Sequence, residues 1–164
     1  MLKNKQYHQA VQFFSEFLLN NPDNVEALNG LADGQHRSGD PMTAILTYQK
    51  SLLNESNQPE VWLSIGNIQY YNNLFPEATL SYQKSAELDS NNSKVYNNLG
   101  SVLKEQRKFD QAIINFKKAY DIDPKYALAC RNLGDIYLRQ GGKTDAILWL
   151  KNAVKLDPEN MRGQ

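Results

Sequence analysis

Alanine recurs at one fixed interval along the whole chain. The alanines follow one another every 34 residues and stand at Ala10, Ala44, Ala78, Ala112 and Ala146. A single period that persists from end to end predicts a stacked array of repeated units, rather than a globular domain with one core. An array of this kind offers an extended surface, so the functional question becomes what that surface binds.

Other columns of residues share the period. A large side chain follows each alanine by four positions, at Phe14, Tyr48, Tyr82, Phe116 and Leu150. Leucine or isoleucine followed by a small residue precedes the last four alanines, as Leu31-Ala32, Ile65-Gly66, Leu99-Gly100 and Leu133-Gly134. The small residues predict the points where two helices cross at close range, because the side chains at a contact set the distance between helix axes.

Within each unit the apolar residues have helical spacing. Val95, Leu99 and Val102 fall on one face of a first segment, and the same spacing returns after Ala112. Between such segments Gly39-Asp40-Pro41 predicts a turn, with Asp40 as an N-cap and proline at the first helical position. Each unit is therefore predicted to be two short amphipathic helices joined by a tight turn.

This order of residues resembles the tetratricopeptide repeat. The best match is Tyr96-Asn97-Asn98-Leu99-Gly100 followed by Ala112, Phe116, Ala119 and Pro124. The resemblance covers nearly the whole chain, as a single array over 1–164 with a half repeat at 1–24 and full repeats at 25–58, 59–92, 93–126 and 127–160. It implies an all-α fold, a right-handed superhelix (α-solenoid) of antiparallel helix pairs. The first helix of each pair would line a concave groove and the second would form the convex back.

Both ends of the array depart from the pattern. The segment around Ala10 reads as a second helix with no first helix ahead of it. Two interpretations follow: a piece of a longer protein, or uncapped ends that allow self-association. Trp149 stands where other units have Thr, Ser or Asn, which suggests a docking surface. Gly30 and Gly34 lie inside the first helix of the first full unit, which we expect to be the least stable helix.

Composition favours an interaction module over an enzyme. The 18 basic and 18 acidic residues balance, and no Lys/Arg stripe favours nucleic acid. His8 and His36 lack companions at metal-ligand spacing, and no phosphate loop or nucleophile motif is visible, so no cofactor, no metal and no catalytic residue are predicted. Cys130 stands in an apolar column, which predicts a buried thiol. No apolar run could enter a membrane and no signal peptide is visible, so a cytoplasmic location is expected.

The resemblance also implies which residues face the groove. Binding of a protein or peptide ligand is predicted for Asn29, Asp33, Arg37, Ser64, Asn67, Tyr70, Tyr71, Lys94, Asn97, Asn98, Ser101, Glu105, Arg131, Asn132, Asp135 and Arg139. The side-chain amides can hold a peptide backbone without demanding a particular sequence. Cations are concentrated in the last two units, so we expect an acidic segment of the ligand to lie there.

Three functions within the family can be compared. A chaperone clamp for a terminal carboxylate is rejected, because Leu63, Leu128 and Asn132 occupy its basic places. The asparagine ladder of O-linked N-acetylglucosamine transferases is matched at Asn98 and Asn132 but not at Gly30 or Ser64. The sequence therefore favours a non-catalytic protein–protein interaction scaffold. The alternative is the substrate-recruiting arm of a larger enzyme such as a transferase of that kind.

Overall fold

The computed structural model describes residues 2–158, with side chains from residue 5 onward. The described residues form nine α-helices and no strand, namely α1 (Leu2–Asn20), α2 (Val25–Ser38), α3 (Pro41–Asn54), α4 (Pro59–Tyr71), α5 (Phe75–Leu88), α6 (Ser93–Glu105), α7 (Phe109–Ile122), α8 (Ala127–Arg139) and α9 (Lys143–Leu156). This confirms the predicted all-α solenoid of helix pairs. The last two residues of the predicted fourth repeat, 159 and 160, lie outside the described part of the chain.

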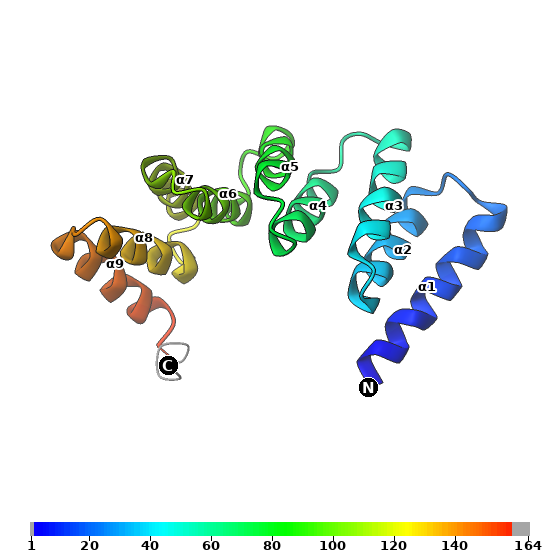
Figure 1. The fold of residues 1–164 in the computed structure, drawn as a ribbon, viewed down its shortest axis with the longest axis horizontal. Helices are drawn as coiled ribbons and strands as arrows, with labels where there is room; N and C mark the ends of the chain where they lie inside the picture. Colours follow the sequence, from blue (N-terminus) through cyan, green and yellow to red (C-terminus); the bar gives the residue numbers. More distant parts are fainter. Residues whose placement is uncertain (1, 159–164) are drawn as a thin grey trace.

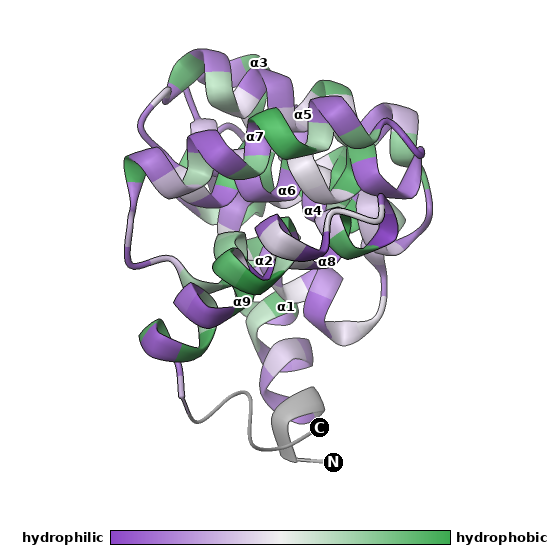
Figure 2. Cartoon of the chain, turned by 90° about the vertical axis from the view of Figure 1, so that its left-hand side faces the viewer, coloured by the Kyte–Doolittle hydropathy of each residue, from purple (hydrophilic) through white to green (hydrophobic). Residues whose placement is uncertain are grey.

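The helices are arranged in two layers that follow an arch. Helices α2, α4, α6 and α8 lie on the hollow side of the arch, whereas α3, α5 and α7 lie on its outer side (Figure 1). Figure 2 looks onto the C-terminal end and shows α3, α5 and α7 above α4 and α6. Within residues 2–158, no helix is both long and apolar enough to cross a membrane.

The turn inside each pair uses the same backbone conformation four times. Gly39, Asn73, Arg107 and Gly141 are spaced by the repeat period, and all four have positive φ, between 60° and 102°. Glycine adopts this left-handed conformation without strain, whereas a residue with a Cβ atom such as Arg107 does not. After the first of these turns, Asp40 accepts a hydrogen bond from the backbone N–H of Thr43 at 3.3 Å and caps α3, as predicted.

The small residues mark close helix crossings, as the sequence predicts. Ala44, Ala78, Ala112 and Ala146 are all fully buried. At Gly100, an added Cβ atom would lie 2.5 Å from ring atoms of Phe116, and at Gly66 the corresponding contact with the Tyr82 ring would be 2.6 Å. Each glycine therefore lets the first helix of a pair approach the large residue of the second.

Most of the buried apolar residues form two clusters rather than one. The N-terminal cluster spans α2 to α4 and includes Ala32, Tyr48 and Ile65. The C-terminal cluster spans α5 to α8 and includes Tyr82 and Phe116. Helix α4 belongs to both, because Ile65 lies in the first cluster while Leu63 and Tyr70, on the same helix, pack against the second.

The two glycines of α2 have a packing role that the sequence did not reveal. Helix α1 lies directly against α2, and an added Cβ atom at Gly30 would fall 2.4 Å from the Phe14 ring. At Gly34 it would fall 3.0 Å from a methyl group of Val11 and 3.4 Å from the Val11 backbone nitrogen. These glycines allow α1 to dock closely. The expected low stability of α2 stays a prediction.

Trp149 packs within the chain. Its half-buried ring meets Tyr120 of α7 edge to face, with 5.1 Å between ring centroids. The indole fills space against the preceding repeat, and a docking surface at its exposed side stays a prediction. Cys130 is buried as predicted, and burial raises the pKa of its thiol.

Candidate interaction groove

A pocket of about 340 Å³ lies on the hollow side of the arch, between α4, α6 and α8. We call it the concave pocket. Eight of the sixteen predicted ligand-binding residues line it, namely Asn67, Tyr70, Tyr71, Asn97, Asn98, Ser101, Arg131 and Asn132. All eight lie on α4, α6 and α8, the first helices of successive repeats, and the repeat period brings them together. Ligand binding by these residues stays a prediction.

Asparagine side chains join the three helices across the concave pocket. Asn98 Nδ2 of α6 donates to Asn67 Oδ1 of α4 at 2.8 Å. Asn132 Nδ2 of α8 donates to Asn97 Oδ1 of α6, also at 2.8 Å. Tyr82, from the outer layer, donates its hydroxyl to the same Asn67 oxygen at 2.9 Å. The chain thus uses part of its amide capacity to fix neighbouring repeats to one another.

Several amide groups of this network are left for a ligand. Asn97 is only 2% exposed and serves the structure. In the part of the chain that the structure describes, Asn67 Nδ2 and Asn132 Oδ1 form no hydrogen bond, whereas the Asn98 amide contacts both Asn67 and Tyr82. An amide presents two donors and an acceptor. The concave pocket therefore offers both donors and an acceptor to an extended backbone.

Two tyrosines form the wall of the concave pocket on α4. Their rings meet edge to face, with 5.5 Å between the centroids of Tyr70 and Tyr71. Tyr70 also packs against Phe75 of α5, whereas Tyr71 is 77% exposed. Burial first, and then the nearby Glu105 carboxylate, raises the pKa of Tyr70. The pair combines an anchored ring with an accessible one, and tyrosine is enriched among the residues that contribute strongly to binding in known interfaces.

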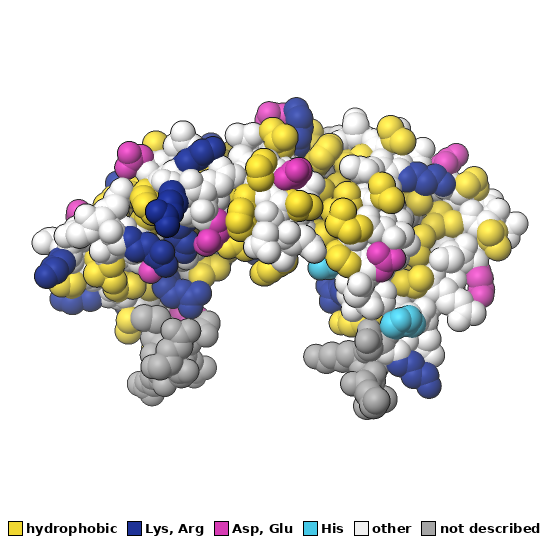
Figure 3. Space-filling view, in the orientation of Figure 1, with side chains coloured by type: hydrophobic (Ala, Val, Ile, Leu, Met, Phe, Trp, Pro, Cys, Tyr) yellow, Lys and Arg dark blue, Asp and Glu magenta, His cyan; other side chains and the backbone are white. Residues whose placement is uncertain are grey.

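Cations gather at the C-terminal end of the concave pocket. Lys104 Nζ lies 3.3 Å from Asp135 Oδ2, and Arg139 Nε lies 3.4 Å from the same oxygen. One carboxylate is thus shared by two cations. Arg131 and Lys94 are exposed and form no ion pair among the described residues. Figure 3 shows Lys and Arg side chains gathering over the C-terminal half of the visible face.

The other predicted residues lie outside the concave pocket; they are Asn29, Asp33, Arg37, Ser64, Lys94, Glu105, Asp135 and Arg139. Asp135 and Arg139 form the ion pairs described above, and Asn29, Asp33 and Arg37 also have partners inside the chain. Asn29 Nδ2 donates to Gln58 Oε1 at 2.7 Å, and Asp33 accepts the hydroxyl of Tyr48. The guanidinium of Arg37 lies 5.6 Å from the centre of the Tyr7 ring, and the hydrogen bond to Tyr7 raises the pKa of Arg37.

Three residues absent from the predicted set also line the concave pocket: Tyr82, Lys104 and Leu128. Tyr82 stands in the column of large residues four positions after the alanines, and its ring is buried. A buried tyrosine usually finds a hydrogen-bond partner for its hydroxyl. That requirement is the signal that could have placed the Tyr82 hydroxyl beside the groove asparagines.

The buried phenols predict a loss of stability at alkaline pH. Burial is the main reason why the pKa values of Tyr48 and Tyr82 lie well above the ordinary 10.0. The unfolded chain loses these protons first, so the free energy of unfolding is expected to fall as the pH rises above about 10. Urea titrations from neutral to alkaline pH would measure this fall.

Phenylalanine variants provide the comparison. Tyr48→Phe with Tyr82→Phe should flatten the dependence on pH, whereas Tyr71→Phe, at an exposed ring, should leave it unchanged. If the double variant lost stability with rising pH as steeply as the original protein, Tyr48 and Tyr82 would not be the cause of the loss.

Among the described residues, no group of three or more His, Cys, Asp or Glu could hold a metal ion.

The fold defines a class, the helical repeat solenoids, in which stacked helix pairs form an arch with one hollow side. Family profiles described as tetratricopeptide repeat match residues 93–126 and 127–160. The flanking helix pairs have the same architecture, and the chain belongs to the tetratricopeptide repeat family.

Solved structures of MamA share the fold. One MamA crystal structure is 22% identical with a TM-score of 0.89, and the match covers 98% of this chain and 94% of that one. A MamA structure from Desulfovibrio magneticus RS-1, residue 41 to its end, is 17% identical with a TM-score of 0.86, over 99% and 91% of the two chains. At these identities the likeness concerns the fold alone. A comparison with curated proteins found no match.

Proposed function

We propose that the chain is a non-catalytic scaffold that holds an extended, acidic segment of a partner protein in the concave pocket. Tetratricopeptide repeats mediate protein–protein interactions, and this chain has their architecture. The observation that carries the proposal is the combination, in one pocket, of amides from three helices with an unpaired arginine.

The amides suit an extended backbone. Asn67, Asn98 and Asn132 come from successive repeats, and each keeps hydrogen-bonding capacity after the internal contacts are made. An extended peptide presents alternating N–H and C=O groups that can pair with such amides. The neighbouring Tyr71 ring supplies apolar contact area at low cost in side-chain entropy.

The charges favour an acidic segment. Arg131 of α8 lines the concave pocket, Lys94 stands one helical turn before Asn98 on α6, and both are free of ion pairs within the described residues. Arg139 shares Asp135 with Lys104, so part of its charge also remains for a ligand. Hydrogen bonds between arginine and carboxylate are among the stronger polar contacts.

Charge reversal at the C-terminal end of the groove is expected to weaken the binding of acidic peptides. The probe is a fluorescein-labelled peptide of alternating Glu and Ser, measured by fluorescence anisotropy over a series of salt concentrations. Arg131→Glu with Arg139→Glu should lower the affinity by about tenfold or more and reduce its dependence on salt, because charge-assisted hydrogen bonds are lost.

Two controls accompany this experiment. Lys125→Glu reverses one charge, half of the change in the double variant, at an exposed residue in the loop before α8, and it should leave the affinity nearly unchanged. A peptide with Gln in place of Glu should bind weakly to every variant. Equal affinity of the original protein and the double variant would reject the acidic ligand.

The amides are tested separately. Asn98→Ala with Asn132→Ala removes two donors from the concave pocket while all cations stay in place. A scaffold that holds the backbone would lose partners in a pull-down with this variant. The alternative, the recruiting arm of a glycosyltransferase-like enzyme, depends on the same two asparagines and stays a prediction.

A further inference from the structure

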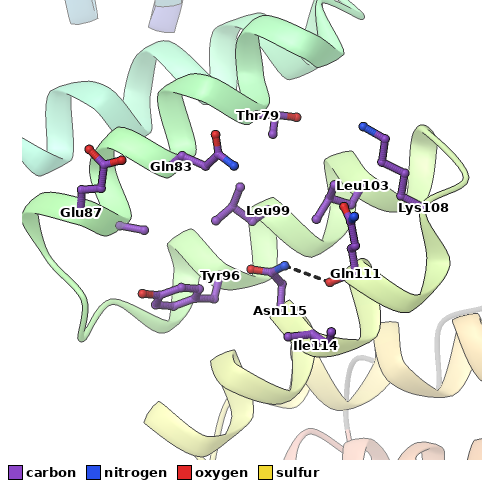
Figure 4. Close-up of a pocket in the computed structure, with 11 residues that line it drawn as sticks. Thr79, Gln83, Glu87, Tyr96, Leu99, Leu103, Lys108, Gln111, Ile114 and Asn115 are labelled. Atoms are coloured by element: carbon purple, nitrogen blue, oxygen red, sulfur yellow. Dashed lines mark hydrogen bonds between the residues drawn. The ribbon is translucent and has the colours of Figure 1, made fainter.

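A second, larger groove lies on the opposite face of α6. It has a volume of about 660 Å³ and runs between α5 and α7 on the outer side of the arch. Tyr96, Leu99 and Leu103 of α6 form its floor, and Gln83 and Gln111 stand on its two walls (Figure 4). We call it the outer groove. None of the residues that line it lines the concave pocket.

The repeat pattern explains why the outer groove is open. Ala86 and Asn115 line it on α5 and α7. One repeat later, the same two positions are held by Tyr120 and Trp149, whose rings pack together across α7 and α9. One repeat earlier, the position of Ala86 is held by Leu52, which packs against the N-terminal core cluster. The outer groove is therefore open because Ala86 has only a methyl group at the position where the neighbouring repeats have Leu52 and Tyr120.

The polar side chains around the outer groove do not fill it. Asn115 Nδ2 is turned along its own helix and donates to the Gln111 carbonyl at 2.9 Å (Figure 4). Gln106 Nε2 donates to Thr79 Oγ1 at 3.1 Å, which joins α5 to the end of α6. The leucine side chains of the floor remain the apolar surface that an inserted group would meet.

The rim of the outer groove is cationic at both ends. Lys108, at the start of α7, is exposed beside Leu103. At the other end, the Lys118 ammonium lies 4.0 Å from the centre of the Tyr96 ring and is exposed. The only carboxylate among the lining residues, Glu87, is neutralised by Lys84 at 2.7 Å. This charge distribution favours a negatively charged partner segment.

We propose that the outer groove is a second interaction site, which takes one aromatic side chain of a partner protein with acidic residues on either side of it. The neighbouring repeat supplies the template, because the indole of Trp149 already occupies the corresponding interval. Aromatic residues provide the large buried area that anchors most interfaces. The two lysines would pair with the flanking carboxylates.

The test uses two short peptides and NMR spectroscopy of the ¹⁵N-labelled protein. The first peptide carries one Trp flanked by two Glu on each side, and the second carries Ala in place of Trp. Signals of Ala86, Leu99 and Asn115 should shift with the Trp peptide and not with the Ala peptide. Shifts confined to the concave pocket, or equal shifts with both peptides, would overturn the proposal.

A variant that fills the outer groove gives the decisive test of the proposal. Ala86→Tyr with Asn115→Trp transfers the Tyr120–Trp149 pair into the outer groove, and affinity for the Trp peptide should fall by about thirtyfold. If the Trp peptide caused the same shifts around the outer groove in this variant as in the original protein, the proposal would be overturned. The reciprocal variant, Tyr120→Ala with Trp149→Asn, opens the next interval and should create a second set of shifts on α7 and α9.

Surface variants test the charges without touching the core. Lys108→Glu with Lys118→Glu should weaken binding of the Trp peptide, whereas Lys117→Glu, on the same helix but over Tyr137, should not. Arg131→Glu with Arg139→Glu, which tests the concave pocket, should leave the outer shifts in place. If concentrating the protein alone shifts the same signals, the occupant is a second copy and the proposed partner is wrong.

Discussion

Replacing Phe116 by Ala is expected to lower the free energy of unfolding by about 3–5 kcal/mol, the usual cost of removing a buried phenylalanine. The ring is fully buried in the C-terminal cluster and lies against Gly100. Glycine cannot move into the space that the ring leaves, so the cavity would persist. Urea unfolding followed by circular dichroism measures the loss.

Phe13→Ala is the matched control for this experiment. It deletes the same atoms from α1, where the ring is 63% exposed. The change in unfolding free energy should stay within about 0.5 kcal/mol. Equal losses in the two variants would contradict the assignment of Phe116 to the core that joins successive repeats.

Replacing Gly30 by Asn is expected to release α1 from α2. Asparagine stands at the corresponding position of α6 and α8 and favours helix more than glycine does. The new Cβ atom would nevertheless lie 2.4 Å from the Phe14 ring, and such overpacking costs about 1–3 kcal/mol. Hydrogen exchange should show faster exchange of the α1 amides than in the original protein.

Ser64→Asn provides the comparison for Gly30→Asn. It places the same side chain at the same repeat position of α4, where the residue is already half-buried and carries a Cβ atom. Exchange of the α1 amides should not change in this variant. If Gly30→Asn also leaves them unchanged, α1 is not held by the close contact that the structure shows.

Much of the fold could be predicted from the sequence, because the same contacts between small and large residues recur in every repeat. Ala112, Phe116 and Gly100 each belong to a column, and a column reports what every unit must satisfy. Departures from the columns were harder to interpret. From the sequence alone, the glycines of α2 are expected only to weaken the helix, because their role in the close packing of α1 is visible only in the structure. The sequence suggests a surface position for Trp149, because the Tyr120 ring that packs against it lies far away along the chain.

The candidate site was predictable to a smaller extent. Helical spacing is sufficient to place Asn67, Asn98 and Asn132 on one face of the array. It does not show which amide atoms already form hydrogen bonds between neighbouring repeats, as Asn132 Nδ2 does with Asn97 Oδ1. The outer groove was missed for a related reason. Its opening depends on small side chains at two positions, Ala86 and Asn115, whose columns hold larger residues in the next unit.

The division of the core at α4 has a mechanical consequence. Contacts in a solenoid are made between neighbouring repeats, so a bending load cannot be shared by distant parts of the chain. Ile65 and Leu63 of α4 face different clusters, and α4 is therefore the place where the arch is expected to flex. The concave pocket extends from α4 towards the C-terminal end. A partner bound there would leave α1, α2 and α3 free to move as one unit relative to the rest of the arch.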